Sequence, residues 1–480
     1  MYRTHKSIVL AAMIIVNSQL SLSGAVGAKD ACIDLDESRQ NSTQSIVNGQ
    51  SSTYNGSWTV DQCMAYAVAH NHQVHQKELE VKNNQMDKLS AIGNFIPSVD
   101  GGVSARYSFG RGIDPETNVY DHISTFHNNY FIEANMLIFR GGSLVSQVRK
   151  AQANVKMGKA ALQEAQDNTA LDTFQAYIQA LYCMGTVRMA KQKLAESDSL
   201  LYKARLQEEI GMKGMADVAQ MEAQQATDAY NYTHQQHLFE TAMLTLKQKM
   251  NYPMEDELLL DSTLLDSPVM EQANLDLVDK EQVVNLALVG NPTLQKSLFK
   301  AQAQKMESRG AWSEVLPSIS LYAGLNTSYY KQLHVDTYPS FKNQFKDNYG
   351  SYIGISLSVP IFSQFKGVSS VRKARNSYRI AQEQYEEQKL ELRKLVEQAV
   401  MDREGYLRES IQMEKKVASD QLAYQVTKRK YEEGLMTSLD VQHNAATWLE
   451  SQASLLQSKL TYFLKCRLVE YYKGNDIIQQ

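Results

Sequence analysis

The sequence predicts an internally duplicated membrane protein, in which four amphipathic strands per chain form a transmembrane β-barrel and long coiled-coil helices continue it as a tube. Three observations support this fold class. Segments of alternating polarity occur in four places, two long tracts contain no proline, and landmarks of the first half recur in the second. Because an open sheet leaves backbone groups unpaired in hydrocarbon, the strands must close through oligomerisation. Two chains would supply eight strands and three would supply twelve, and both numbers are allowed.

The N-terminus is typical of an exported protein. Residues 1–28 have the pattern of a signal peptide, with Arg3 and Lys6 before an apolar run that starts at Ile8. A short membrane anchor is the alternative, which the brevity of the run disfavours. Residues 29–57 are rich in Ser, Asn, Gln and Gly, and we expect a disordered leader. No other stretch approaches the roughly 20 apolar residues of a membrane helix. The formal net charge of −4 offers no basic stripe for nucleic acid.

The first repeat is predicted over residues 58–250. A helical pattern runs from Trp58 and ends before Pro97. The next residues alternate between apolar or small and polar or small side chains over about 11 positions, which suits a tilted membrane strand. A loop is expected from Gly110 to Phe126, followed by a return strand that ends at Arg140. The apolar face of this return strand is predicted to carry Tyr130, Ile132, Ala134, Met136 and Ile138.

A long helix is predicted to follow and to end at Ile210, where Gly211 and Gly214 interrupt the pattern. A second helix returns from about Ala216 to Met250. The long helix carries a heptad seam with alternating spacings of four and three residues. The seam consists of Leu144, Val148, Ala151, Val155, Gly158, Leu162 and Ala165.

Residues 251–279 are predicted to be a connector, and residues 280–474 repeat the pattern, before a C-terminal tail at 475–480. The interval from Pro97 to Pro317 is slightly shorter than the interval from Gly211 to Gly434, so a short insertion separates two related halves. The second strand pair is predicted from Ile319 to Tyr329 and from Ser351 to Val359, with a long loop through Pro339 between them. A long helix with its own seam and a last helix, from about Ser438 to Tyr472, complete the repeat. The seam is Val371, Ala374, Tyr378, Ala381, Tyr385, Leu392, Leu395, Ala399 and Tyr406, with Gln388 and Asp402 as interruptions.

With these elements in order, the chain resembles the TolC-type outer-membrane efflux protein family from Trp58 to Tyr472. The resemblance rests on the duplicated element order, on the segment from Val359 to Phe362 after the last strand, and on the two glycine-containing helix turns. It implies a homotrimer with a shared twelve-stranded barrel in the cell outer membrane and an α-helical barrel that extends into the periplasm. It also implies a passive exit duct for small molecules such as drugs, alongside a periplasmic adaptor protein and an inner-membrane pump.

The resemblance also implies that the two turns form a periplasmic tip where the duct closes. Tyr431 and Asp217 match positions that hold the tip shut by a hydrogen bond, and Asp440 matches an acidic position at the entrance. Two positions depart from the family, because His443 replaces a second acidic residue and Met436 replaces a basic gate residue. A ring of Asp440 side chains would raise their pKa by mutual repulsion. The candidate tip and gate residues are Gly211, Asp217, Tyr431, Gly434, Asp440 and His443. Helix-turn chemistry alone is the simpler explanation for the glycines and aspartates.

Sequence motifs for catalysis or cofactor binding were not found, so we expect neither enzymatic activity nor a cofactor. In the cluster His70, His72 and His75, the last two are spaced i, i+3 on a helix and could share a metal ion, although exposed polar residues at a helix end are the simpler interpretation. Metal-ion efflux and type I polypeptide secretion therefore stay open as alternative duct functions. More distant alternatives are a coiled-coil structural or adhesive surface protein, a soluble sandwich with attached helices, and a periplasmic enzyme.

Overall fold

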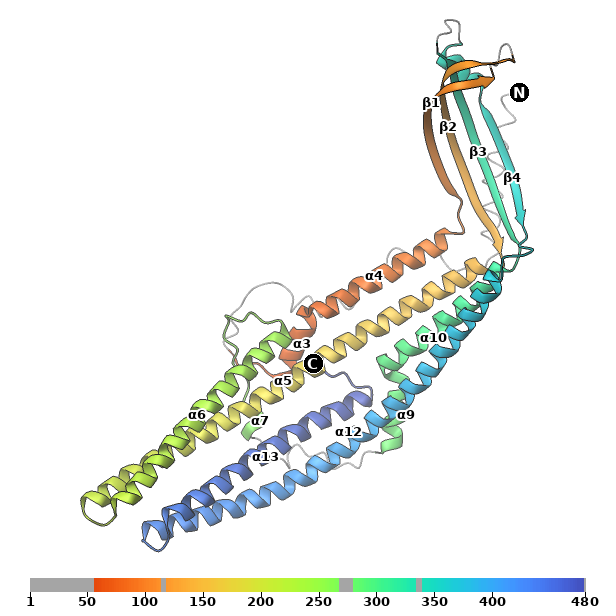
Figure 1. The fold of residues 1–480 in the computed structure, drawn as a ribbon. Coiled ribbons are helices and arrows are strands. Elements are labelled where there is room, and N and C mark those ends of the chain that lie inside the picture. The colour runs from red at the N-terminus through yellow and green to blue at the C-terminus, as the bar shows by residue number, and fades with distance from the viewer. Residues whose placement is uncertain (1–55, 114–117, 267–278, 334–338, 479–480) are drawn as a thin grey trace. The chain divides into compact units, whose positions relative to one another are not determined.

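The computed structural model describes residues 56–113, 118–266, 279–333 and 339–478 (Figure 1). The predicted signal peptide and nearly all of the predicted leader lie outside these residues. Two repeats of helices and strands follow each other along the chain. The first contains α3 (Val60–His70), α4 (His72–Gly93), β1 (Ser98–Ile113), β2 (Tyr120–Arg140), α5 (Ser143–Glu209) and α6 (Met215–Met250). The connector contains α7 (Thr263–Asp266). The second repeat contains α9 (Lys280–Gly290), α10 (Pro292–Gly310), the 3-10 helix η1 (Ala311–Glu314), β3 (Ser318–Gln332), α11 (Phe341–Asp347), β4 (Gly350–Ser358), α12 (Lys366–Glu432) and α13 (Ser438–Tyr472).

The four described strands form one antiparallel sheet in the order β1-β2-β3-β4. The predicted alternation is present across all of them. One row of cross-strand neighbours is apolar and contains Val99, Ala134, Ala323 and Ile353. The adjacent row is largely polar and contains Asp100, Glu133, Gly324 and Tyr352, whose hydroxyl donates to Glu133 over 2.5 Å. One face of the sheet is therefore suited to lipid and the other to water.

The structure corrects the prediction for the strand ends. The expected loop from Gly110 to Phe126 is wrong, because β1 continues to Ile113 and β2 already begins at Tyr120, with Ile113 opposite Tyr120 in the ladder. Near the end of β2, Ile138 lies at an interruption of the regular strand pairing. A bulge between Leu137 and Phe139 shifts the register, so that Phe139 is the residue opposite Ile319.

The expected loop through Pro339 contains the unpredicted helix α11. Its Phe345 ring lies 5.3 Å from the Tyr130 ring, and the carbonyl of Phe345 accepts a hydrogen bond from Thr327 over 2.7 Å. Gln344 exchanges hydrogen bonds with the backbone of Tyr330. These contacts hold the short helix against β2 and β3.

The two long helices have the same length of 67 residues and occupy equivalent places in the two repeats. The seam predicted for α5 is confirmed, since every one of its members is buried or half-buried. The seam of α12 differs at one position. Leu395 is exposed in the single chain, and the next residue, Val396, is fully buried instead.

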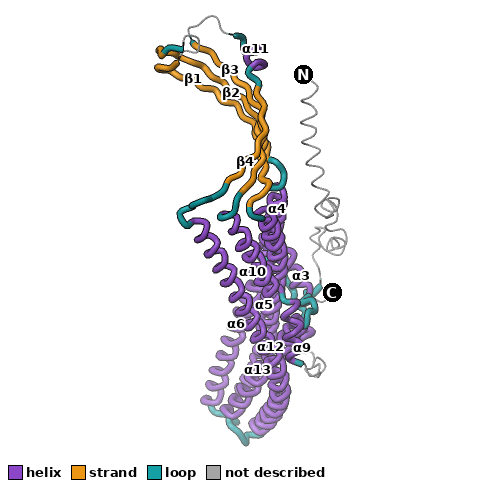
Figure 2. The backbone as a smooth tube through the Cα atoms, turned by 90° about the vertical axis from the view of Figure 1, so that its right-hand side faces the viewer, coloured by secondary structure: helices purple, strands orange, loops and turns teal. Residues whose placement is uncertain are grey.

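The helices pack as neighbours in two groups (Figure 2). Next to the sheet, α4 packs against α5, α5 against α10, and α10 against α12. Farther along the long helices, α5 pairs with α6 and α12 pairs with α13. The largest apolar core lies where α3, α5, α6 and α13 meet, and it includes Met64, Phe174, Tyr177 and Leu246. Among the described residues, no helix is long and apolar enough to cross a membrane.

Candidate functional site at the helix turns

The first turn joins α5 to α6 through Gly211. This glycine has φ +75°, a left-handed conformation that side chains disfavour, and its N–H donates to the carbonyl of Glu208 over 2.8 Å. The N–H of Met212 donates to Gln207 over 2.8 Å, which satisfies another carbonyl at the end of α5. Asp217 lies in the first turn of α6, where its carboxylate accepts from the N–H of Gly214 over 3.4 Å.

The second turn joins α12 to α13 and repeats this design. Gly434 has φ +77° and donates to Tyr431, while Leu435 donates to Lys430 over 2.8 Å. Thr437 caps α13 in a capping box with Asp440, whose carboxylate accepts from the Thr437 hydroxyl over 2.6 Å and from its N–H over 3.0 Å. The helix-turn chemistry expected for the two glycines and the two aspartates is thus confirmed.

A contact between Lys213 and Tyr431 connects the two turns. Lys213, in the first turn, donates to the hydroxyl of Tyr431, the second-last residue of α12, and its Nζ lies 3.8 Å from the centre of the tyrosine ring. Both a charged hydrogen bond and a cation–π interaction therefore act across the two hairpins. A second residue pair adds to this connection, because Ser438 donates to Gln220 over 2.7 Å.

Below the turns, an apolar cluster joins the same two hairpins. It is formed by Leu200, Leu201, Ala204, Val218, Met221, Tyr424, Tyr431, Val441 and Ala445. The Tyr424 ring stacks on Trp448 at 5.3 Å, and Lys428 pairs with Glu196 over 2.5 Å. Burial by itself raises the pKa of the Glu196 carboxyl, but the hydrogen bond and positive charge of Lys428, together with the nearby Tyr424 hydroxyl, outweigh it and hold that pKa below its ordinary value. The hairpins are therefore held together by packing and by a paired charge.

The predicted site residues fall into two groups. Gly211, Asp217, Gly434, Asp440 and His443 are exposed, whereas Tyr431 is buried between the hairpins. The hydrogen bond expected between Tyr431 and Asp217 is replaced here, because the tyrosine is bonded by Lys213 and the aspartate caps its own helix. In the single chain, the hydrogen bonds from the side chain and then the backbone of Thr437 lower the pKa of Asp440, with a smaller contribution from His443.

Sequence reasoning missed Lys213 and Tyr424, which contact the other hairpin, and Trp448, which packs on Tyr424. Lys213 and Tyr431 lie far apart in the chain, one in each repeat, and no spacing rule relates them. The one available signal was the repeat itself, which predicts that equivalent turns lie close together.

The side chains of His70, His72 and His75 are all exposed. His70 stacks on Tyr66 with ring centres 4.0 Å apart and bonds the Tyr66 carbonyl through Nδ1, while His75 lies 3.3 Å from Glu78. Within the described parts of the chain, no group of three or more His, Cys, Asp or Glu side chains is arranged to hold a metal ion.

Comparisons with known proteins define the class. The family model described as "Outer membrane efflux protein" matches residues 64–251 and 283–462, which is most of the chain and reproduces its two repeats. The chain therefore belongs to the outer membrane efflux protein family. It is an outer-membrane efflux duct whose helices extend into the periplasm. No curated protein matched the sequence.

Several solved structures share the fold. A crystal structure of CusC is 14% identical and aligns over 89% of this chain and 96% of that one, with a TM-score of 0.75. The CmeC outer membrane channel of Campylobacter jejuni is 16% identical over 88% and 87%, with a TM-score of 0.73. The outer membrane protein VceC of Vibrio cholerae is 14% identical over 88% and 97%, with the same TM-score. At such identities the likeness concerns the fold alone.

Proposed function

We propose that three copies of this chain form the exit duct of a tripartite efflux system, which passively conducts small molecules such as drugs from the periplasm to the exterior. A periplasmic adaptor protein and an inner-membrane pump complete the system. The observation that carries this proposal is a four-stranded sheet with two free edges that continues directly into two 67-residue helices.

The free edges favour a closed ring of identical chains. Among the described strands, β1 pairs only with β2, and β4 pairs only with β3. The helices below them also present unpartnered apolar side chains in the single chain, including Met86 and Leu89 on α4 and Ile380 and Leu390 on α12. A neighbouring copy that places its β4 and α12 against β1 and α4 would bury both sets at once. Such a head-to-tail contact generates a ring when its rotation closes.

The conducting path would follow the polar face of the sheet. Asp100, Glu133 and Tyr352 lie on that face, and the row on the other face is apolar. The sequence contains no phosphate-binding loop, so the energy for transport comes from the pump.

Polypeptide secretion and metal-ion efflux are the alternatives within the same fold. Among the described residues, no feature favours either of these alternatives. The choice among the three substrate classes therefore depends on a transport measurement.

The test compares cells that lack this protein with cells that express it again. The proposal predicts that the deletion raises the intracellular accumulation of a fluorescent efflux dye and that expression restores the lower level. Dye accumulation that is unchanged, combined with loss of a secreted polypeptide from the medium or with retention of copper or zinc, would overturn the small-molecule assignment. Immunoblotting of the outer-membrane fraction provides the control for expression and insertion of the restored protein.

A further inference from the structure

The helix segments next to the sheet carry an excess of positive charge that the duct function does not explain. From residue 143 to 163, the start of α5 contains Arg149, Lys150, Lys156 and Lys159 and no acidic residue. The first part of α12, from residue 366 to 382, contains five cations and again no acidic residue. The rest of α5, by contrast, holds more acidic than basic residues, and the whole chain has a net charge of −4.

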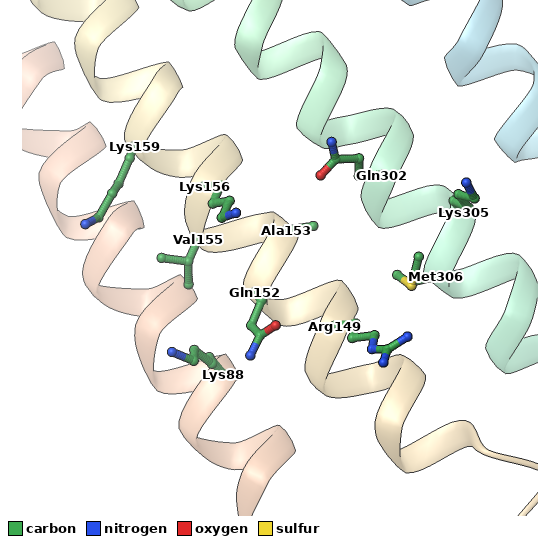
Figure 3. A pocket seen from close by; sticks show the side chains of 10 residues that line it. All are labelled: Lys88, Arg149, Gln152, Ala153, Val155, Lys156, Lys159, Gln302, Lys305 and Met306. Atoms are coloured by element: carbon green, nitrogen blue, oxygen red, sulfur yellow. The ribbon is translucent and has the colours of Figure 1, made fainter. Parts of the chain in front are cut away.

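Part of this charge lines a groove of about 670 Å³ that crosses α4, α5 and α10 (Figure 3). Its cations are Lys88 from α4, Arg149, Lys156 and Lys159 from α5, and Lys305 from α10, and its remaining lining residues are uncharged. Of the ion pairs between described residues, none involves any of these five side chains. Lys156 instead lies 5.7 Å from the centre of the Phe299 ring. Five like charges without a counter-ion favour the binding of an anion.

The groove lies on the same face of α5 that packs against α3 nearer the middle of the long helix. Phe174 follows Lys156 by about five full turns of the α-helix, so these two residues lie on the same face of α5. Tyr177 follows Lys159 by the same number of residues and shares that face in the same way. Phe174 and Tyr177 are buried in the core beneath α3, and the Tyr177 hydroxyl donates to the Trp58 carbonyl over 3.0 Å. In a closed duct this face points outward, because copies of α3 and the connector would otherwise fill the lumen. This orientation rests on the proposed function.

The groove is also close to the level where the membrane ends. Trp312, Phe362 and Phe365 are exposed at the junctions between strands and helices, as expected for an aromatic belt at a membrane interface. Lys305 lies about two helical turns before Trp312. Arg149 lies roughly 9 Å from the start of α5, at about 1.5 Å per residue. The side chains of Lys88, Arg149 and Lys305 reach a headgroup layer beside the belt, whereas Lys156 and Lys159 lie roughly 20 and 24 Å along α5 and extend the positive charge away from the membrane.

We propose that this groove binds the anionic headgroup of a phospholipid in the periplasm-facing leaflet of the outer membrane. The lysine and arginine side chains neutralise the headgroup phosphate, and the apolar lining from Ala153, Val155 and Met306 accepts the adjoining part of the lipid. The lipid would anchor the helices to the membrane at the outer face of each chain.

The test uses the full-length oligomer in a nonionic detergent, with bound lipid counted by native mass spectrometry during titration with phosphatidylglycerol, phosphatidylethanolamine or inorganic phosphate. The groove variant is Lys88→Gln/Arg149→Gln/Lys305→Gln, which removes the three groove cations nearest the strands, and the control is Lys191→Gln/Lys389→Gln/Lys415→Gln, which removes three exposed lysines elsewhere. Each basic residue strengthens binding to an anionic lipid surface by roughly fivefold. We therefore expect phosphatidylglycerol to bind the groove variant on the order of a hundredfold more weakly, with the control unchanged.

Several results would overturn the proposal. Equal binding of both phospholipids would do so, as would binding of phosphatidylglycerol by the groove variant at the wild-type level. Displacement of the lipid by millimolar phosphate would show that the groove binds a soluble anion instead. If the wild-type and control proteins cosediment with peptidoglycan and the groove variant does not, the groove binds that polymer instead. The wild-type protein supplies an independent check, since high salt should weaken the lipid binding by screening.

Ion conductance separates this proposal from the proposed duct. The groove variant should conduct with wild-type ion selectivity, and a changed selectivity would place the groove in the lumen and contradict the lipid site. Absence of conductance in the wild-type protein would overturn the duct instead, and the lipid titration would still report on the groove.

Discussion

We propose that the Lys213–Tyr431 contact holds the two hairpins together in a closed state of the duct, and this gives a graded prediction. Lys213→Met removes both the hydrogen bond to the tyrosine hydroxyl and the cation–π contact, whereas Tyr431→Phe removes only the hydrogen bond. A hydrogen bond to a charged group contributes about 1.5–3 kcal/mol, and partial exposure of the lysine reduces this to about 1 kcal/mol. The cation–π contact adds about 0.5–1 kcal/mol. Lys213→Met should then favour the open state by about 1–2 kcal/mol, or roughly fivefold to thirtyfold in the open-to-closed ratio.

Single-channel recording in planar bilayers measures this ratio as the open probability. The predicted order is Lys213→Met above Tyr431→Phe above wild type. Lys430→Met is the control, because Lys430 is exposed beside Tyr431 and forms no ion pair with the described residues. Equal open probabilities in all four proteins would refute the reasoning, as would a larger effect from Tyr431→Phe than from Lys213→Met.

Three further predictions concern stability. Gly434→Ala should lower the free energy of unfolding by about 1–2 kcal/mol, because alanine disfavours the φ of +77°. Gly405→Ala should raise it by up to about 1 kcal/mol, because this glycine lies inside α12 with open space around it. Opposite shifts in the melting temperatures of the two variants would support this prediction, and parallel shifts would contradict it. Tyr177→Phe removes a buried hydroxyl that donates to the Trp58 carbonyl, and it should lower the free energy of unfolding by roughly 1–3 kcal/mol in chemical denaturation. Limited proteolysis should then cleave the variant faster near residue 58 than the wild-type protein. The depressed pKa of Glu196 stabilises the folded protein fully above about pH 4.3, its unfolded value, and this contribution is lost as the pH falls through the lower folded pKa. Glu196→Gln should therefore flatten the acid side of the stability profile, and an unchanged profile would argue against the pair with Lys428.

The long helices could be predicted from sequence because their heptad seams and glycine stops are local signals. The structure departs where packing decides among neighbours. In α12 the buried residue is Val396 and not Leu395. The buried positions on this part of the helix are 392, 396, 399 and 400, so the spacing after Leu392 is four residues where the predicted seam has three. The heptad rule predicts the seam but not such a local shift between adjacent apolar residues.

The strand ends were harder to predict because glycine and charge near a hairpin resemble loop composition. Gly110 and Gly112 suggested a turn, yet both lie within β1, opposite Ile123 and Asp121. Pairing between two strands thus overrides local propensity. The bulge near Phe139 could not be predicted for the same reason, since it depends on the register of β3.

For the candidate site, sequence predicted the backbone but not the contacts. The left-handed glycines and the capping aspartates follow from local rules. The bond from Lys213 to Tyr431 depends on how two hairpins from different repeats approach each other, and no local rule specifies that approach.

The central claim is that this chain forms a closed duct, and the conductance of the purified oligomer in a planar bilayer tests it most directly. We predict insertion with a small, cation-selective conductance. Asp440→Asn, which can still accept the N–H of Thr437, should reduce the cation selectivity without unfolding the turn. An unaltered selectivity would keep the duct and remove Asp440 from its entrance. A folded, stable oligomer that never inserts or conducts would contradict the account and favour a coiled-coil surface protein.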